Sequence, residues 1–262
     1  MSQRFDRTVL GRPRWIAATA VALAVAAACV LLGLWQLDRL AERRDRNATI
    51  AARSVEEARP LAALRSEFND DPDRLAYRHA FATGTYDTDL EFFSVGRVYG
   101  DTAGTLVATP MRLADKSVLI VVRGLVPNGT PGPPAAGYEP RATPTRIEGR
   151  LMAGEAPSRI GEPAPEGGHL SALSRLDLDY VDQWVDGEVV PFMLLLDDQD
   201  PKPANTPLPL PDGDLTDGRH LGYAVQWFAF AAIAVMGLVA LLFRASRVPG
   251  ASEDALDRAR ME

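Results

Sequence analysis

Two long stretches without a charged side chain constrain the fold of this chain more than any other feature. Residues 15–37 and 221–243 contain no Asp, Glu, Lys or Arg and are mostly apolar. A helix of about 23 residues is about 34 Å long, enough to cross a hydrocarbon layer of about 30 Å. No segment between them is apolar and uncharged over more than a handful of positions. The sequence therefore predicts two transmembrane helices.

The first stretch has an alternative interpretation as a cleaved signal peptide. It follows a basic segment, and small residues precede Cys29 as they do at a cleavage site. Apolar residues nevertheless continue through 30–35, where a mature secreted chain turns polar. We therefore interpret residues 15–37 as a retained membrane anchor.

Basic residues near the spans predict the orientation of the chain. Arg244 and Arg247 follow the second span, whereas only Arg219 lies just before it. By the positive-inside rule the C-terminus is cytoplasmic, and two spans place the N-terminus on the same side. The predicted order is a cytoplasmic N-terminus at 1–14, a span at 15–37, an extracytoplasmic domain at 38–219, a span at 221–243 and a cytoplasmic tail at 244–262.

The charge and cysteine content of residues 38–219 exclude several classes of function. This segment has 20 Lys and Arg against 30 Asp and Glu, a net charge of −10. An acidic domain is a poor partner for nucleic acid or for an anionic lipid surface. The only cysteine, Cys29, lies inside the first span, so the domain has no disulfide and no thiolate metal or haem-attachment site.

Short apolar segments between Pro- and Gly-rich loops predict a β-rich domain. Residues 118–122 and 189–196 are apolar throughout, as in strands buried on both faces. Residues 77–86 and 147–151 alternate, as in strands with one buried face, and residues 87–89 predict a hairpin turn. Strands are expected at 77–86, 90–98, 106–113, 118–122, 147–151 and 189–196.

Helical and extended segments complete the predicted architecture. The helical pattern of the first span continues to about Val55, and a short helix is expected at 174–185. The Pro-rich residues 201–211 predict an extended strap that leads back to the membrane. The expected fold is an α+β membrane protein, in which two transmembrane helices flank one antiparallel-β-rich extracytoplasmic domain, built as a compact sheet or a barrel.

Side chains that carry chemistry are sparse in this sequence. It contains no G-x-S-x-G, P-loop, G-x-G-x-x-G or H-E-x-x-H motif. Of the three histidines, His79 lies in a predicted strand and His169 in a Gly-rich loop, and both positions favour structural roles. Gln36 and Gln226 lie within the spans; because a lipid-facing amide is costly, each is expected to face protein or water, with a mutual hydrogen bond as one arrangement.

The third histidine, His220, stands at the outer mouth of the second span. On a helix it shares one face with Tyr223 and Trp227, and with the small residues Ala224 and Ala231, which would leave room beside the rings. This face is interpreted either as an interfacial aromatic belt or as a surface for a flat ligand. By themselves the residues favour the aromatic belt.

Two motifs resemble the surfeit locus protein 1 family. Residues 32–40, L-G-L-W-Q-L-D-R-L, are similar to the family signature L-G-x-W-Q-L-x-R-L. Residues 219–228, R-H-L-G-Y-A-V-Q-W-F, are similar to its second signature, H-L-x-Y-A-x-Q-W-F. Weaker matches at 84–87, 110–113 and 121–127 lie between them in the same order. The resemblance therefore covers nearly the whole chain.

The match at 121–127 departs from the family pattern N-R-G-W-V-P at two positions. Val122 and Leu125 stand where the family usually has Asn and Trp, whereas Arg123 and Gly124 agree with it. A role of the usual Asn and Trp side chains does not carry over to this chain.

The resemblance implies a non-enzymatic assembly factor for haem–copper cytochrome c oxidase in a bacterial plasma membrane. Such a protein binds haem a and assists its insertion into the oxidase core subunit, with haem a synthase as a further candidate partner. The resemblance assigns His220 to the haem iron, and a neutral imidazole is an ordinary axial ligand. Arg219 is then placed to pair with a propionate, and Tyr223 and Trp227 to flank the macrocycle.

Two alternatives from other classes of protein remain open. One is a membrane-anchored scaffold that holds oxidase subunits without a cofactor. The other is a tethered extracytoplasmic hydrolase, which would need a catalytic cluster that no motif indicates. An absorption spectrum of the purified protein distinguishes the assembly factor from the scaffold, and loss of an activity on Ser or His substitution would support the hydrolase.

The predicted topology is open to a direct test. Reporters fused after Thr105 and after Arg260 should report an external and a cytoplasmic location respectively, because the basic residues after the second span are retained inside. An external signal from the fusion after Arg260 would overturn the orientation.

Overall fold

The computed structural model describes residues 13–99, 102–141, 143–158, 170–210 and 215–246. His169 and the predicted tail residues 1–12 and 247–262 lie outside these ranges. The chain forms two compact units. The helical unit comprises the described residues of Met1–Ala48 and Leu215–Glu262, and the β unit comprises those of Thr49–Asp214.

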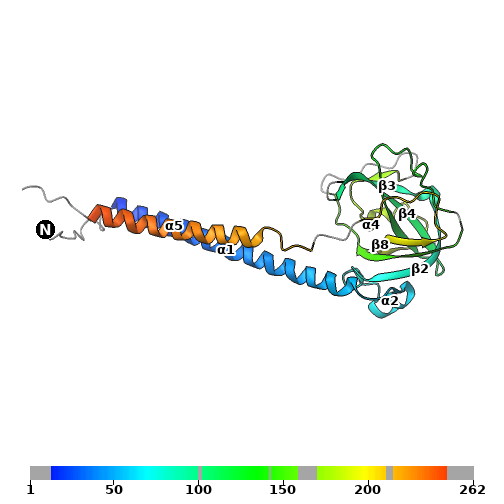
Figure 1. Ribbon diagram of the computed structural model, residues 1–262, viewed down its shortest axis with the longest axis horizontal. Coiled ribbons are helices and arrows are strands. Elements are labelled where there is room, and N and C mark those ends of the chain that lie inside the picture. Colours follow the sequence, from blue (N-terminus) through cyan, green and yellow to red (C-terminus); the bar gives the residue numbers. More distant parts are fainter. Residues whose placement is uncertain (1–12, 100–101, 142, 159–169, 211–214, 247–262) are drawn as a thin grey trace, which may run out of the picture. The chain divides into compact units, whose positions relative to one another are not determined.

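Two long helices dominate the helical unit (Figure 1). Helix α1 is Pro13–Ser54 and helix α5 is His220–Ser246, and each is long and apolar enough to cross a membrane. Two candidate membrane helices near the two ends of the sequence, with a sheet domain between them, agree with the predicted fold class. The side of the membrane on which the β unit lies stays a prediction.

Small side chains line the contact between α1 and α5. The buried residues of α1 recur at intervals of three, four and seven, and those of α5 at seven and eight, close to the spacing of a heptad seam. Small residues allow helix backbones to approach closely, which drives helix association in lipid. At Gly33 an added Cβ would lie 2.7 Å from a ring carbon of Phe228, so any larger residue there would require the Phe228 ring to move. The buried seam residues are Ala26, Cys29, Gly33 and Leu40 on α1, and Ala224, Ala231, Leu238 and Ser246 on α5.

The β unit is built on one mixed sheet of eight strands in the order β1-β2-β6-β8-β5-β4-β3-β7. A further pairing of β2 with β4 closes five of them, β2, β6, β8, β5 and β4, into a ring. All neighbours in the ring are antiparallel except β5 and β8. The strands are β1 Arg59–Pro60, β2 His79–Tyr86, β3 Phe92–Tyr99, β4 Thr102–Leu113, β5 Val118–Val126, β6 Thr145–Ala153, β7 Ala172–Leu173 and β8 Val189–Asp200.

Apolar side chains fill both faces of this sheet. All five ring strands contribute to one cluster, which is therefore the barrel interior, and helices α2 (Leu61–Phe68) and α3 (Pro72–Leu75) pack against it. A second cluster lies on the outer face, under residues 170–181. Every residue of β5 is buried, which confirms the prediction that 118–122 is covered on both faces.

The predicted hairpin at 87–89 is wrong. The segment contains a 3-10 turn, Thr88–Leu90, but β2 and β3 do not pair with each other. Both strands pair with the same edge of β4, one after the other: Tyr86 lies opposite Met111, and Phe92 lies opposite Ala108. The Asp87 amide donates to the Pro110 carbonyl at 2.8 Å and keeps this edge continuous. The acidic turn therefore bends one long edge instead of reversing the chain.

The predicted helix at 174–185 is also shorter than expected. Helix α4 is Leu178–Val181, and the Asp177 carboxylate caps its start by accepting from the Tyr180 amide. The backbone of Leu176 is already bonded to Glu155. The Glu155 amide donates to the Leu176 carbonyl, and the Leu176 amide donates to the Glu155 carboxylate, both at 2.8 Å. These bonds hold the preceding residues extended.

A buried ion pair ties strands β4 and β5 to the residue before β3 and to the loop that contains Ala135 and Tyr138. The side chains of Arg123 and Glu91 are 0% exposed and lie 3.0 Å apart. Glu91 also accepts from the Thr109 hydroxyl at 2.6 Å and from the Ala135 amide at 2.7 Å, and Arg123 donates to the Tyr138 carbonyl. Because these bonds replace water around both charges, neither partner can be removed without leaving the other exposed to an apolar interior.

Arg123→Met should therefore destabilise the β unit by about 3–5 kcal/mol, because it leaves the Glu91 carboxylate buried and uncompensated. Chemical denaturation of the purified full chain in detergent measures the loss. Arg59→Met is the matched control: its ion pair with Glu67 is exposed, and such pairs contribute about 0–1 kcal/mol. Equal effects of the two substitutions would contradict the assigned role of Arg123.

Candidate functional site

Polar side chains of α1 hold the segment that leads into α5. The Arg43 Nε donates to the Thr216 carbonyl at 2.7 Å, and the Asn47 amide donates to the Leu215 carbonyl at 2.7 Å. The Arg44 guanidinium donates two hydrogen bonds to one carboxylate oxygen of Asp217, at 2.9 and 2.6 Å. We call these contacts the polar clamp. They fix the position at which α5 begins.

Gly218 completes the entry into α5. Its φ of +67° lies in the left-handed region, which favours glycine because a Cβ strains the backbone there. The chain turns at this residue and enters the helix at His220. His220 therefore comes immediately after a fixed turn.

His220 lies against Gln36 of α1. Its Nδ1 is 2.9 Å from the Gln36 Oε1, and both side chains are half-buried. An amide oxygen only accepts, so in a neutral His220 the proton lies on Nδ1 and the lone pair on Nε2. Among the residues that the structure describes, none is hydrogen-bonded to Nε2. An imidazole with Nδ1 held by an acceptor and Nε2 open is the usual form of a histidine metal ligand.

The other predicted site residues lie around His220 with different exposure. Arg219 is exposed, and Tyr223 is 45% exposed. Trp227 is half-buried and contacts the Phe230 ring edge-on, with the centroids 5.9 Å apart. On the facing helix Trp35 is 49% exposed. One helical turn from His220, Tyr223 therefore presents an exposed ring, whereas Trp227 is partly covered.

The expectation that small residues leave room beside the rings is wrong at two positions. Ala224 and Ala231 are buried in the seam, with Ala224 only 1% exposed, because α1 covers this side of α5. A flat ligand at His220 would have to approach from the side of Tyr223.

The bond between Gln36 and His220 is what sequence reasoning missed. The suggested pairing of the two glutamines is wrong, because Gln36 is bonded to His220 and Gln226 is exposed. A signal for the correct pairing exists in the sequence. Gln36 continues the spacing of Cys29 and Gly33 toward Leu40, which places it on the same face of α1 as the seam.

The remaining histidines and acidic residues do not form a second site among the described residues. His79 lies on β2 with its Nδ1 3.6 Å from the Asp197 carboxylate, and both side chains are partly exposed. No group of three His, Cys, Asp or Glu side chains gathers as metal ligands in the described ranges. His169 cannot be placed, since it lies outside them.

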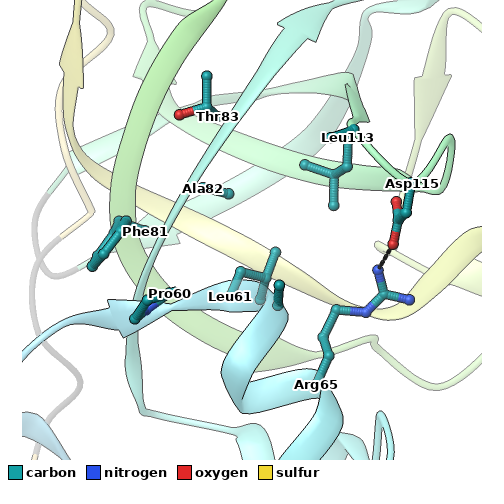
Figure 2. A pocket seen from close by; sticks show the side chains of 10 residues that line it. Pro60, Leu61, Arg65, Phe81, Ala82, Thr83, Leu113 and Asp115 are labelled. Carbon is teal, nitrogen blue, oxygen red and sulfur yellow. Dashed lines mark hydrogen bonds and ion pairs between the residues drawn. The ribbon is translucent and has the colours of Figure 1, made fainter.

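The β unit contains cavities of mainly apolar lining. One of about 360 Å³ lies beside α2 and β2 (Figure 2). At its rim Arg65 is 2.6 Å from Asp115 and also bonds Asp70, so its charge is neutralised. A second cavity of about 260 Å³ is lined by Arg150, Met152 and neighbouring apolar residues. Neither is lined by a histidine, cysteine or serine.

Comparison with known proteins identifies similar chains. The model of the SURF1 family matches residues 23–232. A SURF1-like protein of Rickettsia bellii is 27% identical over 211 residues, which cover 79% of this chain and 83% of the relative. A SURF1-like protein of Monosiga brevicollis is 24% identical over 215 residues, covering 78% of this chain and 79% of the relative.

The geometry of the seam predicts which positions cross-link. In a Cys29→Ala background, cysteines at 36 and 220 should be joined by a short bismaleimide reagent, because the native side chains are in contact. Cysteines at 36 and 226 should link much less, since residue 226 lies about 9 Å of helical rise beyond residue 220. Gel mobility measures both, and preferential linkage of the 36 and 226 pair would contradict the arrangement.

Proposed function

The chain belongs to the SURF1 family, and from this premise we propose that it is an assembly factor for haem–copper cytochrome c oxidase. In this proposal it binds haem a and assists its insertion into the oxidase core subunit. The observation that carries the proposal is the His220 imidazole, whose Nε2 lone pair is open while Nδ1 is held at 2.9 Å by Gln36. No catalytic step is part of the proposal.

The residues at the start of α5 fit a haem by their chemistry. Nε2 of His220 can donate its lone pair to iron, which is the contribution that a haem needs from one axial ligand. Arg219, one residue earlier and exposed, offers a guanidinium for a propionate. The exposed ring of Tyr223, one turn from His220, offers apolar surface for a macrocycle, and the long apolar helices offer it for a hydrocarbon tail.

The arrangement supports temporary binding of the haem. Residues 1–48 and 215–262 contain a single histidine, so this part of the chain supplies one imidazole only. Tyr223 is about half exposed, so the ligand would lie on a surface of the helix pair and not in a closed pocket. A surface site with one imidazole leaves the opposite side of the ligand accessible to a receiving protein.

The proposed partners follow from the same surface. We propose the oxidase core subunit as the recipient of the haem and haem a synthase as its donor, both within a bacterial plasma membrane. Exposed apolar side chains line both helices, and in a membrane such surfaces contact lipid or the helices of another protein. A scaffold without a cofactor would use this surface too, but would have no use for an imidazole with an open Nε2.

Replacing the imidazole tests the proposal. His220→Ala should markedly reduce the haem that is recovered with the purified protein, while expression and membrane insertion stay near normal. Haem content, the position of the Soret band and the spin state should be measured together, since apolar contacts can retain part of the haem. His79→Ala and His169→Ala are the controls, because both histidines lie far along the chain from the helix signatures. Unchanged haem content and an unchanged spectrum in His220→Ala would instead favour the scaffold.

A further inference from the structure

We propose that Gln36 is a positioning residue for the ligand histidine: its side-chain oxygen sets the tautomer and the ring orientation of His220. This inference rests on the proposed function, because it concerns how the same imidazole is presented. The contact that carries it is the 2.9 Å approach of the Gln36 Oε1 to the His220 Nδ1. Gln36 would touch neither the iron nor the macrocycle.

The two side chains are held together from both directions along the helices. One turn before Gln36 on α1, Gly33 lies against the Phe228 ring so closely that an added Cβ would be 2.7 Å from a ring carbon. On the other side, after Gln36 on α1 and before His220 in the chain, the polar clamp holds residues 215–217 to Arg43, Arg44 and Asn47. With α1 and α5 fixed on either side, the distance between Gln36 and His220 does not depend on their own bond alone.

An amide in this position selects one tautomer. The Gln36 oxygen can only accept, so the proton stays on Nδ1 and the lone pair stays on Nε2. An unrestrained neutral imidazole exchanges both the proton position and the ring orientation. Outer partners of this kind commonly change metal affinity by about 10–100-fold when they are removed. Gln36 therefore prepares the ligand before the haem arrives.

The neutral charge of the amide also has a consequence for release. A carboxylate partner would draw the Nδ1 proton more strongly, raise the basicity of Nε2 and strengthen its bond to a metal. An amide oxygen accepts the same hydrogen bond from Nδ1 but attracts the proton less strongly. The choice of glutamine thus suits a protein that must give up its haem to a recipient.

Three variants separate these effects in the full chain, purified in detergent. Gln36→Leu removes the acceptor and should weaken haem a binding by about 10–100-fold. Gln36→Glu keeps an acceptor with a stronger pull, so binding should be retained and the haem reduction potential should fall. Gln226→Leu is the matched control: it removes an exposed glutamine of the same helix pair and should leave affinity, spectrum and potential unchanged.

The haem reduction potentials of the two Gln36 variants distinguish the loss of the hydrogen bond from a general loss of packing, because packing loss would not shift the two potentials in opposite directions. Relative to the wild type, Gln36→Leu should raise the potential of the residual bound haem and Gln36→Glu should lower it. Potentials and affinities equal to the wild type in both variants would overturn the role of Gln36, while a loss of haem in His220→Ala would keep the proposed function intact. A wild-type protein that takes up no haem a would overturn the proposed function itself, and the inference with it.

Discussion

The side-chain contact between α1 and α5 is the interaction on which the candidate site depends. In lipid, apolar side chains gain little by facing each other, so helices associate through tight packing and polar contacts. The seam provides both: small residues from Ala26 to Gly33, and then polar residues from Gln36 to Asn47. A larger side chain at Gly33 would push Phe228 outward and separate the glutamine from the histidine.

The sequence predicted the elements of the helical unit because their signal is local. Charge-free length alone marks both spans, and the heptad positions of small residues continue without a break into the site. The partner of His220 was not predicted. The residue of α1 that faces the start of α5 depends on how far the two helices are shifted along each other, which the sequence does not state. The polar clamp, the turn at Gly218 and the contact of Gly33 with Phe228 fix that register.

In the β unit the strands were predictable and their neighbours were not. Apolar runs and alternation place β5, β6 and β8 close to their observed positions, since burial repeats along each strand. Pairing depends on residues far apart in sequence, and so the turn after Tyr86 was mistaken for a hairpin. The short helix α4 was overestimated for a similar reason: the bonds between Leu176 and Glu155 that prevent a longer helix link distant segments.

The single parallel pair in the barrel is a matter of parity. Around any closed ring each antiparallel neighbour reverses the strand direction, so the number of antiparallel neighbours must be even. A ring of five strands therefore needs at least one parallel pair, and here it is β5 with β8. Strands that run the same way cannot be joined by a tight turn, and the chain must travel the length of the barrel between them. Closure thus requires a return crossing between β5 and β8, and β6, which runs antiparallel to β8, provides it.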